Sequence, residues 1–508
     1  MMTQSEVYRL FGEIDRLPGI MEPRLGRWHA WPIAKMQLVW HLMQAHEPGS
    51  FNGSASLIGK LKQRVPRYGK DLVTAVRQRS RINATPGTGT VGMIYLPRVH
   101  QLRDGRVQDF IFGDLISGEG LLKPSLPLEQ PWPAGGPIHR TNSDAVDLSP
   151  YQSVAEQLAV ALMASPRIRR TAAGIEGELA GSEMPLDPAV RERKILLALS
   201  LFEAKRRLFR RLAKRAHLQA LVVTYGPGRF AEIAAAHELG LPVIELQHGV
   251  IGPHCPDYAW PADYRSLKPD MPVPDRIAVF GRVFRDLILR SGFWRESEIS
   301  SIGSAAMEAF RHGVPPRRRD ARPLRLVFMT QATSRPAAVA FWQEVARSDA
   351  FKVNGLHVAL KIHPEEHAHT YQPVVNTAPD RFRLLVSSVS PIEAMMDADV
   401  VVSYNSMALV EALGLGMPAV SLCGGIIPGG FAGSFDLGNI VSVMPHVASP
   451  QELLAVLNDR AGNEQKLTRW RDDAATHGRD FFTDGFTVAA KNLINETLTQ
   501  SARSQSIH

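Results

Sequence analysis

The sequence predicts an α/β fold with two doubly wound, Rossmann-like domains that face each other across a cleft, behind a helical N-terminal extension. Three observations predict this fold. The chain has 508 residues, which is too long for one ordinary core and favours two domains of about 200–250 residues. Apolar strands alternate with helices in two separate series, which is typical of sheets covered by helices. Between the series, "SLKPDMPVPD" (266–275) supplies three prolines, so the expected domains are 1–85, 86–272 and 273–508.

The first half begins with an amphipathic helical extension, whose tryptophans Trp28, Trp31 and Trp40 are expected to pack against the body of the protein. A hairpin is predicted at "RDGRVQDFIF", because its Asp104-Gly105 pair favours a tight turn. The other expected elements are a strand at 91–96, irregular surface at 123–150, a helix at 188–217, a strand at 220–225, a helix at 230–239 and a strand at 243–247. The last three form a βαβ unit, which makes its two strands parallel.

The second half repeats the strand–helix alternation and is predicted to form a second sheet. Strands are expected at 276–281, 300–304, 324–331, 357–364, 382–387, 399–405 and 418–422, with helices between most of them. The helical region near 485–500 is expected to cross back to the first domain.

Composition favours a cytoplasmic protein with an anionic partner or surface. Two cysteines cannot form a disulfide framework, no apolar run reaches the ~20 residues of a membrane span, and the N-terminus is charged where a signal peptide is apolar. The net charge is +8, and "KRRLFRRLAKR" (205–215) holds seven basic residues. Such a cluster is either a solvated helix face or a contact with the inner face of the membrane. No nucleic-acid-binding module is recognisable, so nucleic acid is not an expected partner.

Polar residues follow apolar strands in both halves, at the carboxyl ends where open parallel sheets bind ligands. Together they outline a site in a cleft between two sheets. Gly249 would let backbone approach a ligand closely there. In the first half the predicted cleft residues are Tyr225, Gly228, Arg229, Gln247 and Gly249, beside His248. In the second half they are Gln331, His363, Pro364, Ser403, Asn405, Ser406 and Glu411.

The stretch "VVSYNSMALVEALGLGMPAV" (401–420) predicts a phosphate site. Ser403 or Asn405 can cap the helix, whose free N–H groups then face the cleft. Glu411 lies further along the helix, at a position suited to ribose hydroxyls. The alternative is a capped helix with one solvated glutamate.

The stretch "HPEEHAH" (363–369) invites a metal interpretation, which its pattern does not favour. It lacks the i, i+4 histidine register of a metal-binding helix, and Pro364 interrupts it. We expect no metal and no cofactor.

"QHG" (247–249), "KIHP" (361–364) and "SYNSMALVEALGLGMPAV" (403–420) together resemble the GT-B glycosyltransferases of bacterial surface-polysaccharide synthesis. The nearest groups are the capsule-type sialyl- and Kdo-transferase-like enzymes with an HP motif. The CDP-glycerol glycerophosphotransferases have a similar layout. The resemblance covers about 220–430 well, and the hairpin region loosely.

The resemblance implies that the C-terminal domain holds a nucleotide-sugar donor, CMP-sugar first, and that no metal takes part. It implies a glycan or lipid-linked acceptor on the N-terminal side. His363 carries over as a donor-phosphate contact, and Ser403 and Ser406 carry over as phosphate-binding hydroxyls. The candidate catalytic groups are His248, Glu119 in "SGEG" and Asp114. The alternatives are a polyol-phosphate transferase, a nucleotide-sugar epimerase or a non-catalytic glycan-assembly subunit.

Overall fold

The computed structural model describes the chain at residues 4–44, 90–95, 99–101, 107–116, 125–130, 145–252, 254–311, 323–331, 334–353, 355–363, 366–386, 389–404, 406–423 and 443–505. Three of the expected site residues, Glu119, Pro364 and Asn405, lie outside these ranges. None of the helices within them is long and apolar enough to span a membrane.

The first sheet has seven parallel strands in the order β11-β10-β9-β8-β3-β6-β7. Alternate strand residues enter two different cores, as the two-residue period of a strand requires. Leu221 and Val223 face one core, and Ala220 and Val222 face the other. The strands are β3 (Thr90–Tyr95), β6 (Ser125–Glu129), β7 (Val146–Asp147), β8 (Leu218–Thr224), β9 (Val243–Leu246), β10 (Arg276–Val279) and β11 (Ile299–Ser301).

The second sheet has six parallel strands in the order β14-β13-β12-β15-β16-β17. One face packs against α10, α12 and α16, and the other against α13 and α14. The strands are β12 (Arg325–Met329), β13 (His357–Lys361), β14 (Phe382–Leu385), β15 (Val400–Ser403), β16 (Ala419–Leu422) and β17 (His446–Val447). The prediction of two doubly wound α/β domains is confirmed, whereas the cleft between them stays a prediction.

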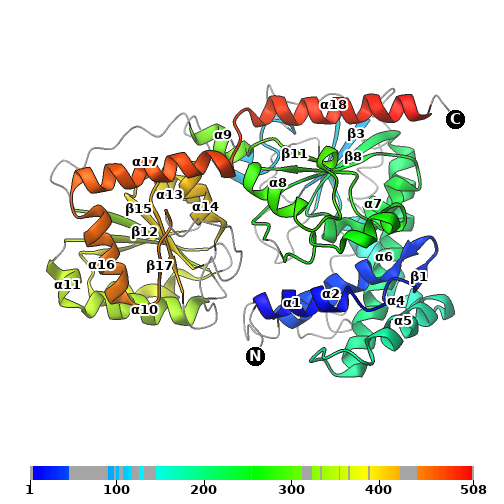
Figure 1. The fold of residues 1–508 in the computed structure, drawn as a ribbon, viewed down its shortest axis with the longest axis horizontal. Coiled ribbons are helices and arrows are strands. Elements are labelled where there is room, and N and C mark those ends of the chain that lie inside the picture. Colours follow the sequence, from blue (N-terminus) through cyan, green and yellow to red (C-terminus); the bar gives the residue numbers. More distant parts are fainter. Residues whose placement is uncertain are drawn as a thin grey trace.

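Helices flank both sheets (Figure 1). Those before and beside the first sheet are α1 (Gln4–Ile14), α2 (Ala30–Gln44), α4 (Ser149–Leu162), α5 (Pro166–Leu179), α6 (Pro188–Arg215), α7 (Phe230–His237), α8 (Arg282–Leu289) and α9 (Ala305–Arg311). Those of the second half are α10 (Arg335–Arg347), α11 (Asp349–Val353), α12 (Gln372–Thr377), α13 (Pro391–Met396), α14 (Met407–Gly414), α16 (Pro450–Ala461), α17 (Glu464–Phe481) and α18 (Phe486–Gln505).

The N-terminal extension contains a buried charge pair that joins two of its own segments. Lys35 Nζ lies 2.5 Å from Asp15 Oδ2, and Trp31 Nε1 donates to Asp15 Oδ1 (2.7 Å). Both charges are at most 1% exposed, so each needs the other to offset the cost of leaving water. Trp31 is fully buried, as expected, whereas Trp40 stays 44% exposed. A short antiparallel pair, β1 (Arg24–Leu25) and β2 (Trp28–His29), interrupts the expected helical run.

Two expectations about the first half are wrong. The boundary expected at 272/273 does not separate the sheets, because β10 pairs with β9 and β11 pairs with β10. The proline-rich segment forms a 3₁₀ helix (Ala262–Asp270), after which the chain re-enters the same sheet. The region 123–150 contains β6 and β7 instead of irregular surface alone. Pro127 lies within β6. The strand was not predicted, because proline is rare inside strands. The hairpin is present as β4 (Val99–Gln101) and β5 (Val107–Asp109), with Asp104-Gly105 outside the described residues.

The C-terminal segment returns to the first domain, as expected. In Figure 1, α17 (orange) lies along the second body and α18 (red) runs over the first. Phe486, Leu493 and Ile494 of α18 share one buried core with strands β3, β8 and β9. At the turn between the two helices, Thr483 N donates to Phe280 O (2.9 Å). The chain therefore crosses between the domains once after β11 and again after α17.

We predict that Gly478→Ala lowers the free energy of unfolding by on the order of 1–3 kcal/mol, the usual cost of overpacking. A Cβ at this position of α17 would lie 2.0 Å from the Leu413 carbonyl oxygen of α14, so the two helices would have to separate. Gly177→Ala in α5 is the matched control, because a Cβ there meets open space. It should add about 0.5–1 kcal/mol through helix propensity. Urea unfolding measures both changes, and equal effects would contradict the close α14–α17 packing.

Candidate functional site

The second sheet has its topological switch point between β12 and β15. From β12 the chain builds β13 and β14 on one side, and then returns to build β15, β16 and β17 on the other. Ligands of open α/β sheets bind outside the carboxyl ends of the strands at such a point. The ends of β12, β13 and β15 are neighbours there, which brings Gln331, His363 and Ser406 to one edge.

The His363 backbone is fixed by a contact between two strand ends. Its N–H donates to the Thr330 hydroxyl (2.8 Å), and Thr330 N donates to Lys361 O (3.1 Å). Thr330 is 3% exposed, whereas His363 is half-buried. A rigid backbone below a partly exposed imidazole suits a ligand contact. The sequence reading missed Thr330, whose only signal was its place at a strand end.

Ser406 caps α14, whereas the sequence predicted Ser403 or Asn405 as the cap. The Ser406 hydroxyl accepts a hydrogen bond from Ala408 N (3.2 Å), and its own proton is left to donate. The Ser403 hydroxyl is fully buried and donates to Met329 O (2.8 Å) between β15 and β12. Because this bond occupies its only proton inside the sheet, Ser403 is corrected to a structural residue.

Glu411 lies in the middle of α14 and is 6% exposed. It is therefore neither the solvated glutamate of the alternative interpretation nor a freely reachable side chain. The capping helix itself is confirmed, and a contact between Glu411 and ribose stays a prediction.

Lys361 is a second group that the sequence reading did not select. It is 4% exposed, and its ammonium donates to Ile362 O (2.8 Å). Burial lowers its pKa to about 8. A lysine within the apolar strand "HVALKI" was the available signal. Lys361 therefore places an amine two residues before His363.

The first sheet has its switch point between β3 and β8, where Tyr225 follows β8. Tyr225 has φ = 57°, a left-handed conformation that is uncommon for a residue with a side chain. Its ring lies 4.7 Å from the His248 ring and 5.9 Å from the Trp40 ring, measured between centroids. Trp40 Nε1 also donates to the Tyr225 hydroxyl (2.8 Å). Backbone strain held by such contacts is a feature of functional sites.

The "GPGR" turn after Tyr225 needs both glycines for contact with neighbouring side chains. A Cβ at Gly228 would lie 2.7 Å from the Tyr225 ring, and one at Gly226 would lie 2.3 Å from the Glu245 carboxylate. Arg229 is 6% exposed. It therefore lies beneath the surface. The sequence predicted it on the cleft wall, which is wrong for an open wall.

Gln247 is engaged within the protein. Its amide oxygen accepts from Phe280 N (2.8 Å), and its amide nitrogen donates to Gly249 O (2.7 Å). It therefore joins β9 to β10, and its ligand role is corrected to a positioning one. His248 is half-buried beside Tyr225, and a Cβ at Gly249 would meet open space.

Asp114 lies in the turn that follows β5. Two residues earlier, the Phe112 ring packs on Tyr95, the last residue of β3, at 5.8 Å between centroids. This contact places the turn at the β3 side of the same switch point. Asp114 is half-buried, and a catalytic role for it stays a prediction.

Two buried carboxyls near the tips of β8 and β9 were missed by the sequence reading. Burial raises the pKa of Glu245 and of Asp257 to about 7. Tyr258 Oη (2.6 Å) and Gly226 N (2.9 Å) both donate to Glu245 Oε1 and oppose the shift. The positive charge of Lys35 opposes the shift of Asp257. A glutamate inside the apolar strand "VIEL" was the available signal.

The basic stretch 205–215 is partly internal. Arg206 binds Glu203 and Glu238 at 2.6–3.0 Å, and Arg207 binds Glu203 at 2.6 Å. Fewer basic side chains of this stretch are exposed and unpaired than the sequence suggested. Among the described residues, the exposed basic side chains of this stretch that bind no carboxylate are Arg211, Lys214 and Arg215.

In the described part of "HPEEHAH", Glu366 belongs to an internal network. Its Oε1 accepts from Arg335 Nε (3.2 Å) and Tyr371 Oη (3.0 Å). Across the described ranges, no group of three or more His, Cys, Asp or Glu side chains has the arrangement of a metal site.

No family model matches the sequence, and no curated protein matches it either. Solved structures of GT-B-fold proteins resemble it at low identity. MurG of Acinetobacter baumannii is 16% identical with a TM-score of 0.38, over 58% of this chain and 80% of that one. A UDP-GlcNAc 2-epimerase from Neisseria meningitidis bound to UDP-GlcNAc is 9% identical with a TM-score of 0.45, over 81% and 100%. A glycosyltransferase from Rickettsia africae is 9% identical with a TM-score of 0.42, over 82% and 99%. Scores this low carry no function across.

We predict that the free energy of unfolding falls less between pH 4.5 and 7 in Glu245→Gln than in the wild type. Burial raises the Glu245 pKa from 4.5 to about 7, so the folded protein holds this proton more tightly than the unfolded chain. The resulting stability is fully present below pH 4.5 and is lost as the pH rises to about 7. Its size is on the order of 1–3 kcal/mol.

Urea unfolding at pH 4.5, 6 and 8 measures the effect. Glutamine keeps an acceptor for Gly226 N and Tyr258 Oη, so the variant should be at least as stable as wild type at pH 8. The exposed Glu183→Gln is the control and should leave the pH profile unchanged. Parallel profiles for Glu245→Gln and wild type would show that Glu245 does not titrate in this range.

Proposed function

We propose that the protein is a metal-independent glycosyltransferase that moves a sugar from a nucleotide-activated donor to a surface-glycan acceptor. One observation supports the proposal: Gln331, His363 and Ser406 follow the neighbouring strands β12, β13 and β15, and α14 begins directly after Ser406. An imidazole, a hydroxyl and helix N–H groups at one edge suit a phosphate-bearing ligand.

The chemical task on the donor side is to stabilise charge on the departing nucleotide phosphate. The first N–H groups of α14 have no partner within the helix, and the positive end of its dipole favours an anion. Ser406 adds a hydroxyl proton and His363 adds a ring N–H. Preorganised donors of this kind stabilise a developing charge without a metal.

On the acceptor side, a base must take the proton of the attacking hydroxyl. His248 is the first candidate, because its half-buried ring is held by Tyr225 at the switch point of the first sheet. Asp114 is the second candidate. Glu119 is a third, and it lies outside the described residues.

The nucleotide is proposed to be cytidine-based, with CMP-sugar first, on the strength of the HP-type resemblance. The same switch-point site would serve a polyol-phosphate transferase, a nucleotide-sugar epimerase or a non-catalytic glycan-assembly subunit. A cytoplasmic location with peripheral contact to the inner membrane face is also proposed. That contact now depends on Arg211, Lys214 and Arg215, and salt-sensitive sedimentation with anionic vesicles would test it.

We predict that His363→Ala weakens nucleotide binding by roughly tenfold to hundredfold, because it removes a hydrogen bond to a charged phosphate worth about 1.5–3 kcal/mol. Ser403→Ala is the matched control. It should leave the affinity unchanged and lower the stability by about 1 kcal/mol, because its hydroxyl bonds only within the sheet. Calorimetric titration of CMP, CDP and UDP measures the affinities. Unchanged affinity in His363→Ala would remove its phosphate role, and tightest binding of UDP would overturn the cytidine assignment.

We predict that His248→Ala retains nucleotide affinity and loses turnover by roughly a hundredfold to ten-thousandfold, the usual range for general acid–base catalysis. Incubation with a panel of nucleotide sugars and a glycan acceptor, followed by nucleotide release, measures turnover. Release that requires the acceptor supports a transferase. A changed sugar without an acceptor would instead indicate an epimerase. Binding without any turnover would indicate an assembly subunit.

A further inference from the structure

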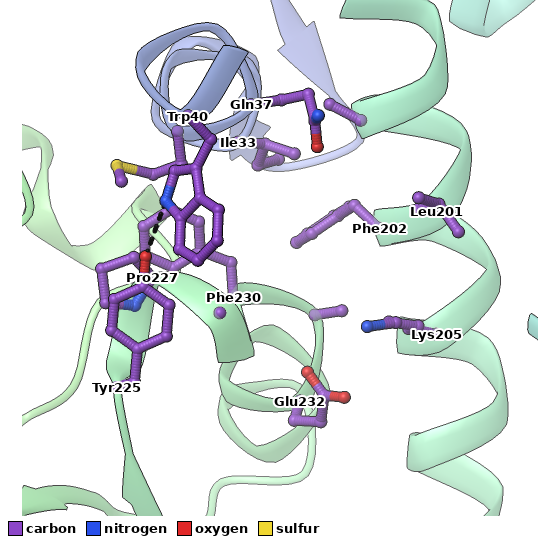
Figure 2. Close-up of a pocket in the computed structure, with 14 residues that line it drawn as sticks. Ile33, Gln37, Trp40, Leu201, Phe202, Lys205, Tyr225, Pro227, Phe230 and Glu232 are labelled. Carbon is purple, nitrogen blue, oxygen red and sulfur yellow. Dashed lines mark hydrogen bonds between the residues drawn. The ribbon is translucent and has the colours of Figure 1, made fainter. Parts of the chain in front are cut away.

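A pocket of about 230 Å³ lies between α2, α6 and α7, next to the turn that follows β8 (Figure 2). It does not include the switch-point residues of the second sheet. Its volume is below the roughly 300–1,000 Å³ of sites for drug-sized ligands, so its occupant would be small. Much of its wall is apolar, formed by Ile33, Met36, Ala198, Leu201, Phe202, Pro227, Phe230 and Ala231.

Two charged side chains enter this apolar pocket without pairing with each other. Figure 2 shows Lys205 reaching in from α6 and Glu232 from α7. Among the described residues, no hydrogen bond or ion pair joins the Lys205 ammonium to any other group, and Lys205 lines the pocket. Glu232 is 1% exposed, and its Oε2 atom has no hydrogen-bond partner within the same described part of the chain.

Arg229, which does not line the pocket, is a second cation that interacts electrostatically with Lys205 and Glu232. It is 6% exposed, and its buried Nε–H has no partner among the residues that the structure describes. Tyr151 Oη can donate to Glu232 Oε1 (3.1 Å) or to Lys205 O (2.9 Å), but it offers no negative charge. Polar groups inside proteins normally have partners, so the unpaired Lys205 ammonium and Glu232 Oε2 in the lining of one pocket point to a missing ligand.

The Lys205 ammonium lacks an acceptor within the pocket. Burial lowers the pKa of Lys205, and the carboxylates of Glu232 and Glu156 offset this only in part. An anionic group on a ligand would give the Lys205 ammonium an acceptor inside the apolar pocket.

We propose that this pocket binds a small organic anion whose apolar body lies against α2 and α6 and whose anionic group meets Lys205. The proposal is independent of the donor site, although Tyr225 and Gly228 of the predicted acceptor side also line the pocket. The pocket mouth supplies a reporter, because the half-exposed Trp40 lines it and donates to the Tyr225 hydroxyl. Occupancy should therefore change the fluorescence of Trp40.

The test is calorimetric titration of octanoate and 4-phenylbutyrate into the full-length protein without nucleotide. Octylamine and octanol, which match octanoate in length, separate charge from apolar contact. At least one anion should bind, octanol should bind more weakly than octanoate, and octylamine should bind more weakly still. Failure of both anions to bind, or octylamine binding as tightly as octanoate, would overturn the proposal.

Two substitutions test the named charges with opposite signs. Lys205→Met should weaken anion binding by roughly tenfold to hundredfold, because a charge-assisted hydrogen bond is lost. Glu232→Gln should tighten it, because a repelling carboxylate is removed. Lys214→Met, on the exposed face of the same helix, should change nothing. A thermal melt checks folding of each variant. Equal affinity in Lys205→Met and wild type would contradict the proposal, whatever becomes of the transferase assignment.

Discussion

The return of the chain at Phe481–Phe482 is the constraint on which both halves depend. The Phe482 ring packs 5.5 Å from Phe280 at the end of β10, and it fills the space that a Cβ on Gly414 of α14 would occupy. Phe280 N is also the donor that holds the Gln247 amide. The contact of Phe482 with Phe280 thus links α14, which begins at the proposed donor edge, to the end of β9, after which His248 follows. Cores packed as densely as proteins are transmit such constraints.

Each candidate site arises where the strand order of a parallel sheet reverses. At that point two helices leave on opposite faces and the strand ends are uncovered. In the second sheet, Thr330 and His363 make this end polar, and the Thr330 hydroxyl holds the His363 backbone N–H. In the first sheet it is occupied by Tyr225, whose strained backbone is compensated by its contacts with Trp40 and His248. The N-terminal extension therefore takes part in the first site, since Trp40 belongs to α2.

Buried charge has different consequences at different places in the first domain. Asp15 and Lys35 satisfy each other with the help of Trp31, and they join two segments within the extension. Glu245 is satisfied by two donors, and its remaining cost appears as a raised pKa. At the α2–α6 pocket, Tyr151 reaches one oxygen of Glu232, whereas Glu232 Oε2 has no hydrogen-bond partner among the described residues. A buried charge without a partner destabilises the folded protein. A ligand is therefore inferred at the α2–α6 pocket.

The sequence by itself determined the elements and the site edges. Continuous apolar runs specified β8, β9, β12, β13 and β15 closely, and His363, Ser406 and His248 lie after the ends of predicted strands. Only the tertiary structure decided which sheet β10 and β11 join, because strand pairing is a long-range choice that local pattern does not encode. It also decided the direction of each polar side chain. Ser403 and Gln247 look like ligand residues in sequence, but the hydrogen bonds of Ser403 to Met329 and of Gln247 to Phe280 turn them inward. Whether a polar group at a strand end faces a ligand or a neighbouring backbone depends on partners that are distant in the chain.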